Sequence, residues 1–263
     1  MKTMQSREWI PGVYQIQDSM GVMMTLIAGH KQALLIDTGY GLEDVRAAIQ
    51  KLTDRPVQVL LTHGHHDHAL GARWFSMVWL AANESSVFQK YTSEPWRRRV
   101  MRQAEQKGLQ VPEDFLTAPM AEPRFLRDTS IDLGGFHAEI LMCPGHTPGS
   151  CVIRIPEADL LITGDDWNPC TWLWFPEALP VQQYRKNLEQ VFALPFRHVL
   201  CSHAAGLFSR EDMRQFLDGI TDVQIQSAGM TDEGNEMGIR TATIFLEHGY
   251  RLVFDADKAK GGK

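Results

Sequence analysis

The stretch Thr62-His63-Gly64-His65-His66-Asp67-His68 decides how this 263-residue sequence is interpreted. It follows the apolar residues 57–61, which predict a buried strand. Alternate side chains of an extended segment share a face, so His63, His65 and Asp67 point to one side, and a helix beginning there brings His68 beside them. Imidazole and carboxylate groups are the ligands that zinc and similar transition metals prefer. The pattern therefore favours a binuclear metal site over a polar, histidine-rich surface loop.

Three further candidate ligands come later in the chain, each next to a predicted strand. His146 lies in a glycine-flanked turn, Asp165 follows the apolar residues 160–164, and His203 follows residues 199–202. A single histidine beyond a strand is more often a structural residue with satisfied hydrogen bonds. The three together, in this order after the histidine motif, predict one site to which the ends of several strands contribute.

With these motifs the sequence resembles the metallo-β-lactamase-fold superfamily over about residues 13–220. The matching segments are Asp37-Thr38-Gly39, residues 62–68, Pro144-Gly145-His146-Thr147-Pro148-Gly149-Ser150, Thr163-Gly164-Asp165 and Ser202-His203. The resemblance implies an α/β fold, a four-layer αβ/βα sandwich with the site along the edge between its sheets. The implied ligands of the first metal are His63, His65 and His146. The implied ligands of the second are Asp67, His68 and His203, with Asp165 bridging both ions and Asp37 orienting the imidazoles from outside the ligand set.

Two neighbouring cations imply a hydrolytic mechanism. They share a water, lower its pKa toward neutrality and present it as a hydroxide that attacks a carbonyl or phosphoryl centre. Asp67 is the expected catalytic residue, because its carboxylate can hold the proton of this hydroxide. Zn²⁺ is the expected metal, with iron and manganese as alternatives.

Single residues distinguish the branches of the superfamily. The β-lactamase branches would call for Cys or Ser where this chain has Asp165, and the di-iron redox branches for an acid where it has His65. The string 144–150 resembles the glyoxalase II and thioesterase-like side. The chain departs from glyoxalase II at residues 69–72, where Gly-Gly is usual, and in the aromatic segment 166–175. The exact branch is therefore left unassigned.

The expected function is a hydrolase that cleaves an ester, thioester or lactone by a bridging hydroxide. A metal-dependent phosphodiesterase is one alternative, although only Arg73 and the cluster Arg97-Arg98-Arg99 with Arg102 offer cations for a phosphate. This cluster is itself interpreted as a solvated helix face rather than an anion site. A mononuclear iron enzyme of the persulfide-dioxygenase kind, or a metal-binding protein without catalysis, is the other alternative.

The tryptophan-rich residues 167–175 bear on the substrate, which we expect to be a small molecule. Aromatic rings beside a metal site favour an apolar or aromatic substrate. They are equally compatible with packing beneath a helical insertion. Exposed aromatic residues on that insertion are in turn compatible with a homodimer interface.

Composition excludes several other classes of protein. The net charge is −6 with acidic and basic residues interleaved, which argues against nucleic-acid binding. No apolar run is long enough to span a membrane, and residues 1–10 lack the apolar core of a signal peptide. The four cysteines lack C-x-x-C spacing, and we expect reduced thiols and a cytoplasmic location.

The chain is predicted to form a single domain over 1–263. Its expected parts include a helical insertion at about 71–127 that is broken at Pro95, and a C-terminal hairpin and tail at 225–263. Apolar spacing predicts helices at 41–52 and 181–194. A third helix is predicted at 209–220, with Ser209 as its N-cap and Asp212 at the third helical position.

Overall fold

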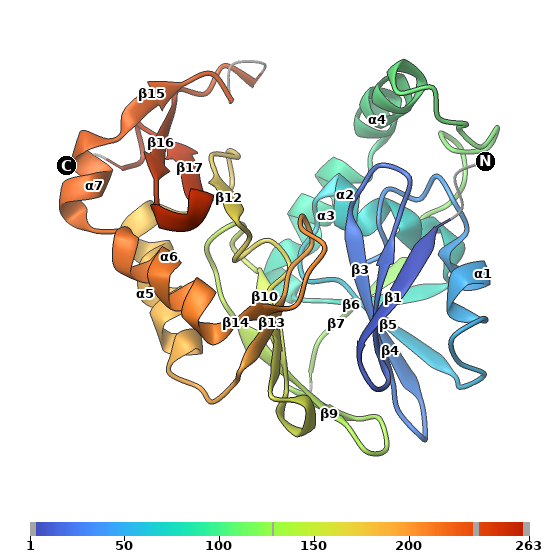
Figure 1. Cartoon of the computed structure of the whole chain (residues 1–263). Coiled ribbons are helices and arrows are strands. Elements are labelled where there is room, and N and C mark those ends of the chain that lie inside the picture. The colour runs from blue at the N-terminus through green and yellow to red at the C-terminus, as the bar shows by residue number, and fades with distance from the viewer. Residues whose placement is uncertain (1–3, 128, 234–236, 260–263) are drawn as a thin grey trace. The chain divides into compact units, whose positions relative to one another are not determined.

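In the computed structural model, which describes residues 4–127, 129–233 and 237–259, the chain forms two compact units (Figure 1). Unit 1 comprises Met1–Glu139 and Ile155–Ala158, and unit 2 comprises Ile140–Arg154 and Asp159–Lys263. Each unit combines a sheet with helices, so the predicted α/β class is confirmed.

Unit 1 contains a seven-stranded sheet with the order β1-β2-β3-β4-β5-β6-β7. The first four strands pair antiparallel, whereas β4 to β7 pair in parallel. Parallel neighbours need a crossover, and α1 (Val45–Ile49) lies in the connection between β4 and β5 with Val45 and Ile49 buried. The strands are β1 (Gln5–Ile10), β2 (Val13–Gln17), β3 (Met23–Ala28), β4 (Ala33–Ile36), β5 (Val57–Leu60), β6 (Met77–Leu80) and β7 (Glu122–Phe125).

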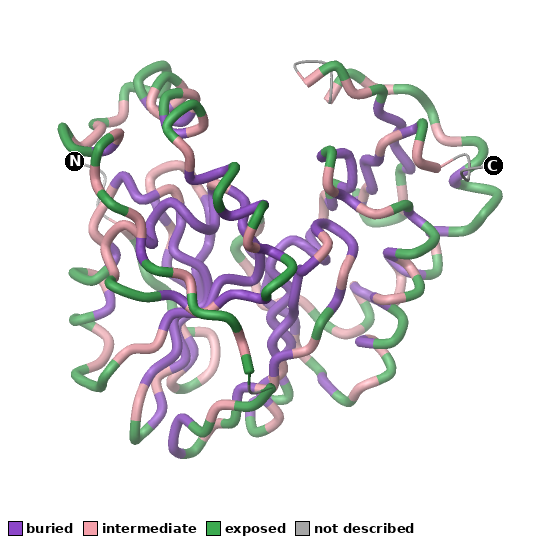
Figure 2. The backbone as a smooth tube through the Cα atoms, turned by 180° about the vertical axis from the view of Figure 1, so that it is seen from behind, coloured by how far each residue is buried: buried purple, intermediate pink, exposed green. Residues whose placement is uncertain are grey.

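The core of unit 1 lies around its central strands. All four residues of β4 are buried, as expected for a strand whose two faces are both covered. Figure 2 shows the inner strands of the sheet buried and the outer turns exposed. The helix predicted at 41–52 is present but shorter than expected, and it covers only residues 45–49.

The predicted insertion at 71–127 contains helices but is not helical throughout. Its helices are α3 (Ser85–Tyr91) and α4 (Glu94–Gln106), and they lie between β6 and β7, two strands of the unit 1 sheet. The prediction of a break at Pro95 was wrong. Pro95 lies in the first turn of α4, where its missing N–H leaves no hydrogen bond unmade, and the break falls at 92–93.

Unit 2 is built mainly on a second sheet with the order β14-β13-β11-β10-β9-β8. Its β11 and β13 are parallel neighbours, and helix α5 lies in the connection between them. Strand β8 and the ends of β9 and β10 belong to unit 1. The elements are β8 (Ser130–Asp132), β9 (His137–Met142), β10 (Cys151–Ile155), β11 (Leu160–Ile162), α5 (Val181–Phe192), β13 (His198–Leu200) and β14 (Phe208–Ser209).

A smaller, four-stranded sheet completes unit 2, with the order β12-β17-β16-β15. The predicted C-terminal hairpin is present as the antiparallel pair β16 and β17, whereas β12 was not predicted as a strand. The tail residues 260–263 lie outside the described residues. The elements are β12 (Cys170–Leu173), α6 (Arg210–Gly219), α7 (Asp222–Ser227), β15 (Gly229–Thr231), β16 (Thr241–Phe245) and β17 (Arg251–Asp255).

Helix α6 begins as its sequence predicts. The Ser209 side chain accepts a hydrogen bond from the Asp212 backbone N–H, and the Asp212 carboxylate accepts one from the Ser209 backbone N–H. This reciprocal pair is a capping box, which satisfies two backbone donors that a helix start otherwise leaves without partners.

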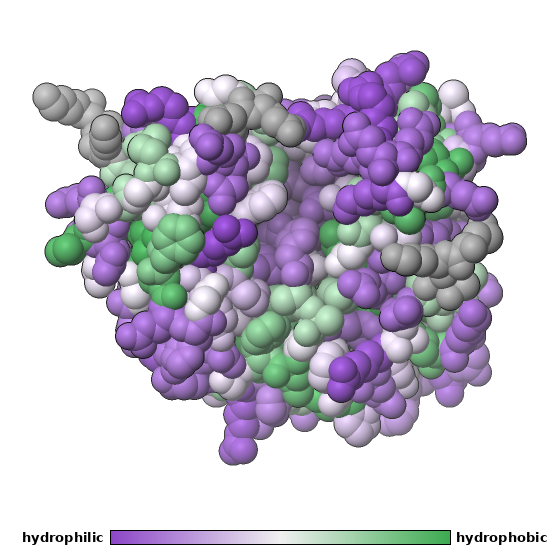
Figure 3. Space-filling view, turned by 45° about the horizontal axis from the view of Figure 1, so that its top comes forward, coloured by the Kyte–Doolittle hydropathy of each residue, from purple (hydrophilic) through white to green (hydrophobic). Residues whose placement is uncertain are grey.

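The surface is mainly hydrophilic on the face seen in Figure 3, where hydrophobic side chains form small separate patches. Large exposed hydrophobic residues of the described chain include Phe125, Trp172 and Phe245. Across the described ranges, every helix is too short or too polar to cross a lipid bilayer.

Candidate metal-binding residues

The candidate ligands follow the carboxyl ends of parallel strands in both units. In unit 1, Asp37 follows β4 and His63 comes shortly after β5. In unit 2, Asp165 and His203 come shortly after the parallel strands β11 and β13. Carboxyl ends of parallel neighbours meet at one edge of a sheet, where α/β proteins commonly bind ligands.

The histidine motif of unit 1 forms a compact cluster of rings. The ring centroid of His63 lies 4.7 Å from that of His65 and 4.1 Å from that of His68. The short helix α2 (His66–Ala69) begins inside the motif, with His65 as its N-cap, and turns His68 toward the preceding histidines. Nε2 of His68 lies 3.7 Å from Oδ2 of Asp67. The expected change from extended chain to helix therefore occurs within the motif.

Asp37 holds two parts of this cluster, as expected of a residue that orients the imidazoles. Its Oδ1 accepts the backbone N–H of Thr62 at 2.8 Å, and its Oδ2 lies 2.8 Å from Nδ1 of His68. Asp37 is buried and has a φ of +65°. A buried carboxylate at Nδ1 fixes the proton of the His68 ring on that nitrogen, so Nε2 keeps its lone pair for a metal.

His66 turns toward other aromatic side chains of unit 1. Its ring lies 5.5 Å from Tyr40, 5.1 Å from Trp96 and, stacked, 5.9 Å from Tyr91. His66 is also the first residue of α2. These contacts place His66 in an aromatic cluster at the start of α2, and His66 is not among the proposed metal ligands.

In unit 2, Asp165 lies between two of the predicted histidine ligands. Its Oδ2 is 3.5 Å from Nε2 of His146 and 3.1 Å from Nε2 of His203. His146 and Asp165 are buried, whereas the His203 side chain is 37% exposed. Nδ1 of His146 lies 2.6 Å from the backbone carbonyl of Trp172, which again leaves Nε2 as the nitrogen available to a metal.

Asn168 supports this group and was missed by the sequence analysis. Its Nδ2 donates to Oδ1 of Asp165 at 3.2 Å, and its Oδ1 accepts the backbone N–H of His203 at 3.0 Å. Asn168 is buried within the tryptophan-rich segment. Its proximity to Asp165 in the sequence was the only available signal, because the partner at His203 lies 35 residues away.

The tryptophan-rich segment forms an aromatic cluster beside His146. Trp174 and Phe175 stack at 4.3 Å, Trp172 lies 5.5 Å from Trp174, and Phe175 lies 5.8 Å from the His146 ring. Trp174 and Phe175 are buried, whereas Trp172 is 40% exposed. Trp167 points elsewhere and packs against Phe208 in the core of unit 2. Trp167 is thus a core residue of unit 2, whereas Trp172 is exposed, and the expected contact with an apolar or aromatic substrate stays a prediction.

The two cysteines that precede predicted ligands are buried residues. Burial raises the pKa of the Cys201 thiol to about 12 and places that of Cys143 well above its usual range. Both thiols are therefore neutral at physiological pH. The four cysteines are not joined in disulfides, in line with the expectation of reduced thiols.

Two of the arginines considered for a phosphate site, Arg73 and Arg97, serve packing instead, whereas Arg98 and Arg102 are exposed as predicted. Arg97 is buried, and its guanidinium donates to the backbone carbonyls of Thr92 and Ala118. Arg73 pairs with Asp114 and also contacts the Trp74 ring. Arg97 therefore does not lie on a solvated helix face, which corrects that part of the prediction.

The donor set fits divalent transition metals. It consists of imidazole nitrogens and carboxylate oxygens, the ligands typical of zinc, iron and manganese sites. In each unit, one candidate histidine has its Nδ1 atom held by an oxygen: His68 by the Asp37 carboxylate, and His146 by the Trp172 carbonyl. This contact orients the ring and its Nε2 atom, as is usual for metal-bound histidines. Candidate ligands of the same unit are also close to one another. In unit 1, for example, the ligand atoms of His63 and His65 lie within 4.8 Å of each other.

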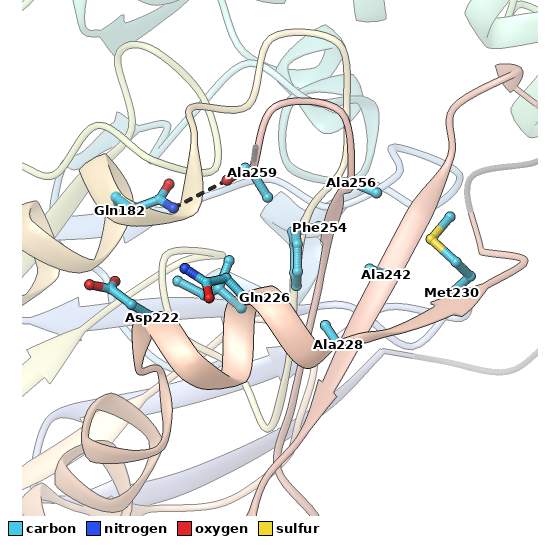
Figure 4. A pocket seen from close by; sticks show the side chains of 10 residues that line it. Gln182, Asp222, Gln226, Ala228, Met230, Ala242, Phe254, Ala256 and Ala259 are labelled. Carbon is cyan, nitrogen blue, oxygen red and sulfur yellow. Dashed lines mark hydrogen bonds between the residues drawn. The ribbon is translucent and has the colours of Figure 1, made fainter. Parts of the chain in front are cut away.

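A cavity of about 580 Å³ lies elsewhere in unit 2, among α5, α7 and the strands β15 to β17 (Figure 4). Figure 4 shows Gln182 and Asp222 at one end and Met230 at the other. Its lining, drawn from the described residues, includes none of the predicted ligands: Gln182, Asp222, Ile225, Gln226, Ala228, Met230, Ala242, Phe254, Ala256 and Ala259.

Comparison with known families gives a match over most of the chain. Residues 19–203 match the family model of the metallo-beta-lactamase superfamily. This range includes all seven predicted ligands and both supporting residues, Asp37 and Asn168.

Three curated relatives are similar over about half of the chain. The probable metallo-hydrolase YqgX of Bacillus subtilis (strain 168) is 31% identical over 51% of this chain and 60% of its own length. The hydroxyacylglutathione hydrolase GloC of Haemophilus influenzae is 34% identical over 51% of this chain and 61% of its own length. The acyl-coenzyme A thioesterase MBLAC2 of Gallus gallus is 27% identical over 56% of this chain and 59% of its own length. The chain thus spans about 60% of the length of the curated relatives it matches.

Solved structures show the same fold. A metallo-beta-lactamase family protein from Thermus thermophilus aligns with a TM-score of 0.60 and 21% identity, over 83% of this chain and 82% of its own. The protein TTHA1623, crystallised in a di-iron-bound form, aligns with a TM-score of 0.52 and 22% identity, over 74% of this chain and 92% of its own.

Proposed function

The chain belongs to the metallo-β-lactamase superfamily, and from this membership we propose that it is a metal-dependent hydrolase that cleaves an ester, thioester or lactone of a small molecule. The hydroxyacylglutathione hydrolase and acyl-coenzyme A thioesterase among its relatives, both named for thioester substrates, support this bond type.

The arrangement around Asp165 is the observation that carries the proposal. One carboxylate oxygen lies within 3.5 Å of two imidazole Nε2 atoms, and each imidazole belongs to a different proposed ligand set. A carboxylate in this position can bind two ions at once, which a lone structural aspartate does not need. We assign His63, His65 and His146 to the first ion, Asp67, His68 and His203 to the second, and Asp165 to both.

When bound, two divalent ions, expected to be Zn²⁺ with iron or manganese as alternatives, supply Lewis acidity and a water that ionises near neutral pH. The protein supplies orientation. Asp67 would accept a hydrogen bond from the attacking water and so orient that water's lone pair toward the substrate carbonyl. Asp37 and the Trp172 carbonyl keep the rings of His68 and His146 in the orientation that the ions require.

The substrate is proposed to carry an apolar or aromatic group. Trp172 is the exposed member of the aromatic cluster that adjoins His146, and an exposed ring offers a large contact area at a low cost in conformational entropy. Bound there, a flat apolar group would lie near a proposed ligand of the first ion.

The alternatives are less well supported. A phosphodiesterase would need cations for its phosphate, and Arg73 and Arg97 are already engaged with Asp114 and with backbone carbonyls. A mononuclear iron enzyme would need only one ligand set, whereas this chain keeps Asp67, His68 and His203. The single domain, the homodimer and the cytoplasmic location stay predictions.

The decisive experiment combines metal analysis with substrate turnover. The purified chain, reconstituted with Zn²⁺, is expected to hold two ions and to hydrolyse members of a panel of thioesters, lactones and aryl esters faster than bis-nitrophenyl phosphate. Asp165→Ala should lower the metal content and reduce kcat/KM by more than the roughly 100-fold typical of lost supporting groups. The control Asp218→Ala, which changes an exposed aspartate paired with Arg214, should behave as the wild type.

Two outcomes would contradict the proposal. One iron per chain with oxygen uptake on glutathione persulfide and no ester turnover would exclude the hydrolase. Full activity and metal content in Asp165→Ala would show that the bridging assignment is wrong.

A further inference from the structure

Glu84 is a buried carboxylate of unit 1 that none of the proposed metal sites uses. It is fully buried and lies directly before α3. Although Glu84 is the N-cap residue of α3, its side chain makes no capping hydrogen bond to that helix. Burying a carboxylate is costly unless it is well compensated, so its contacts bear on its role.

The Glu84 carboxylate reaches the histidine motif instead. Its Oε2 accepts the backbone N–H of Gly64 at 2.8 Å. Gly64 is the residue between His63 and His65, so this one bond fixes the peptide that separates two proposed ligands of the same ion.

Helix α3 touches the motif at two further points. A Cβ atom on Gly64 would collide with the backbone nitrogen of Phe88, so the loop lies directly against the helix backbone there. At the end of α3, the ring of Tyr91 lies 4.5 Å from that of His65. The start, middle and end of the helix thus all contact the loop.

We infer that Glu84 is a positioning residue that holds the His63-Gly64-His65 backbone against α3, so that both imidazoles reach the same ion. The inference rests on the proposed function only in taking His63 and His65 as metal ligands. Glu84 itself is outside the proposed set of metal ligands.

The test is metal affinity without any substrate. Metal-free protein is titrated with Zn²⁺ in competition with a chromophoric chelator, and with Co²⁺ while its ligand-field spectrum is recorded. Glu84→Met keeps the volume but cannot accept the Gly64 N–H, and we expect it to bind the first ion about 10- to 100-fold more weakly with an altered Co²⁺ spectrum. Glu84→Gln keeps an acceptor oxygen and should stay close to the wild type.

Glu8→Ala is the matched control. Glu8 likewise accepts the backbone N–H of a glycine, Gly12, at 2.9 Å, but in the hairpin of β1 and β2. Its loss should leave metal affinity unchanged. Wild-type affinity in Glu84→Met would overturn the inference, and so would equally weak binding in Glu84→Gln, because charge rather than the hydrogen bond would then be responsible.

A second measurement applies if Glu84→Met does not fold. Hydrogen exchange of the Gly64 amide in metal-free wild type should be slow, because the bond to Glu84 exists before metal binds, and exchange at the rate of an open loop would overturn the inference. A wild type that binds two ions but hydrolyses nothing would contradict the proposed function alone. A wild type that binds none would overturn both.

Discussion

At the scale of single residues, hydrogen bonds between distant positions orient the candidate ligands. Asp37 reaches His68 across 31 residues, and Glu84 reaches Gly64 across 20. Each of these carboxylates is buried, and each accepts a backbone N–H near a histidine. The proposed ligand set is therefore supported by buried acids that lie outside that set.

Asp18 is another buried acid, and it gives a prediction about stability and pH. Burial raises its pKa from 3.8 to about 6, against the lowering effect of hydrogen bonds from the backbone N–H groups of Tyr40, Val22 and Gly21. Between about pH 4 and 6 the folded chain holds a proton that the unfolded chain has lost, so the free energy of unfolding falls as pH rises through this window. The contribution is on the order of 3 kcal/mol at most.

Denaturant unfolding at several pH values checks this prediction. Asp18→Asn cannot titrate, so the unfolding free energy of the wild type minus that of the variant should fall as pH rises from about 4 to 6 and level off above. The exposed-site variant Asp218→Asn should keep the wild-type dependence. A constant difference between wild type and Asp18→Asn over this range would show that Asp18 does not titrate there.

At the scale of secondary structure, β12 has two roles that its sequence did not separate. Its pairing with β17 places the Trp172 carbonyl at Nδ1 of His146, whereas the Trp172 side chain is exposed. A substitution of the side chain leaves the carbonyl in place. The proposed substrate contact and the orientation of the His146 ring can therefore be changed independently.

Trp172→Ala tests the proposed aromatic contact. We expect kcat/KM for a phenylacetyl ester to fall about ten-fold, equivalent to roughly 1.4 kcal/mol, because a ring contact is lost. The acetyl ester with the same leaving group should be unaffected, and metal content should not change. Phe245→Ala, which removes an exposed aromatic residue of β16, is the control. Equal losses on both esters would contradict a role in substrate selection.

At the scale of the whole molecule, both units contribute candidate ligands after the ends of parallel strands. If these ligands share two ions as proposed, metal binding stabilises the folded chain as a whole, because the unfolded chain lacks a preformed site. A ligand at 1,000 times its Kd adds about 4 kcal/mol.

Metal removal should therefore lower the thermal stability. Treatment with a chelator is expected to lower Tm by roughly 10 °C for a chain of this size, and Zn²⁺ should restore it. Asp165→Ala should show a much smaller difference between its loaded and chelated forms. An identical Tm for loaded and metal-free wild type would contradict a shared metal centre.

The sequence by itself determined the α/β class, the superfamily and the order of the candidate ligands, because these follow from local patterns: apolar runs, a dense histidine motif and glycine-rich turns. Local spacing also predicted the capping box at Ser209. The strand β12 was not predicted because its alternation of buried and exposed residues is hidden in an aromatic-rich segment. The predicted helical insertion at 71–127 was too wide, because its sequence has no clear helical period outside α3 and α4.

Only the tertiary structure decided which side chains support the ligands. Asn168 meets His203 across 35 residues, Glu84 meets Gly64 across 20, and the Trp172 carbonyl meets His146 across 26. Such hydrogen bonds have no period and no preferred spacing, because they depend on how separate strands and helices pack. Arg97 shows the same limit, since its place in a basic run indicated solvent exposure, whereas packing buries it among backbone carbonyls.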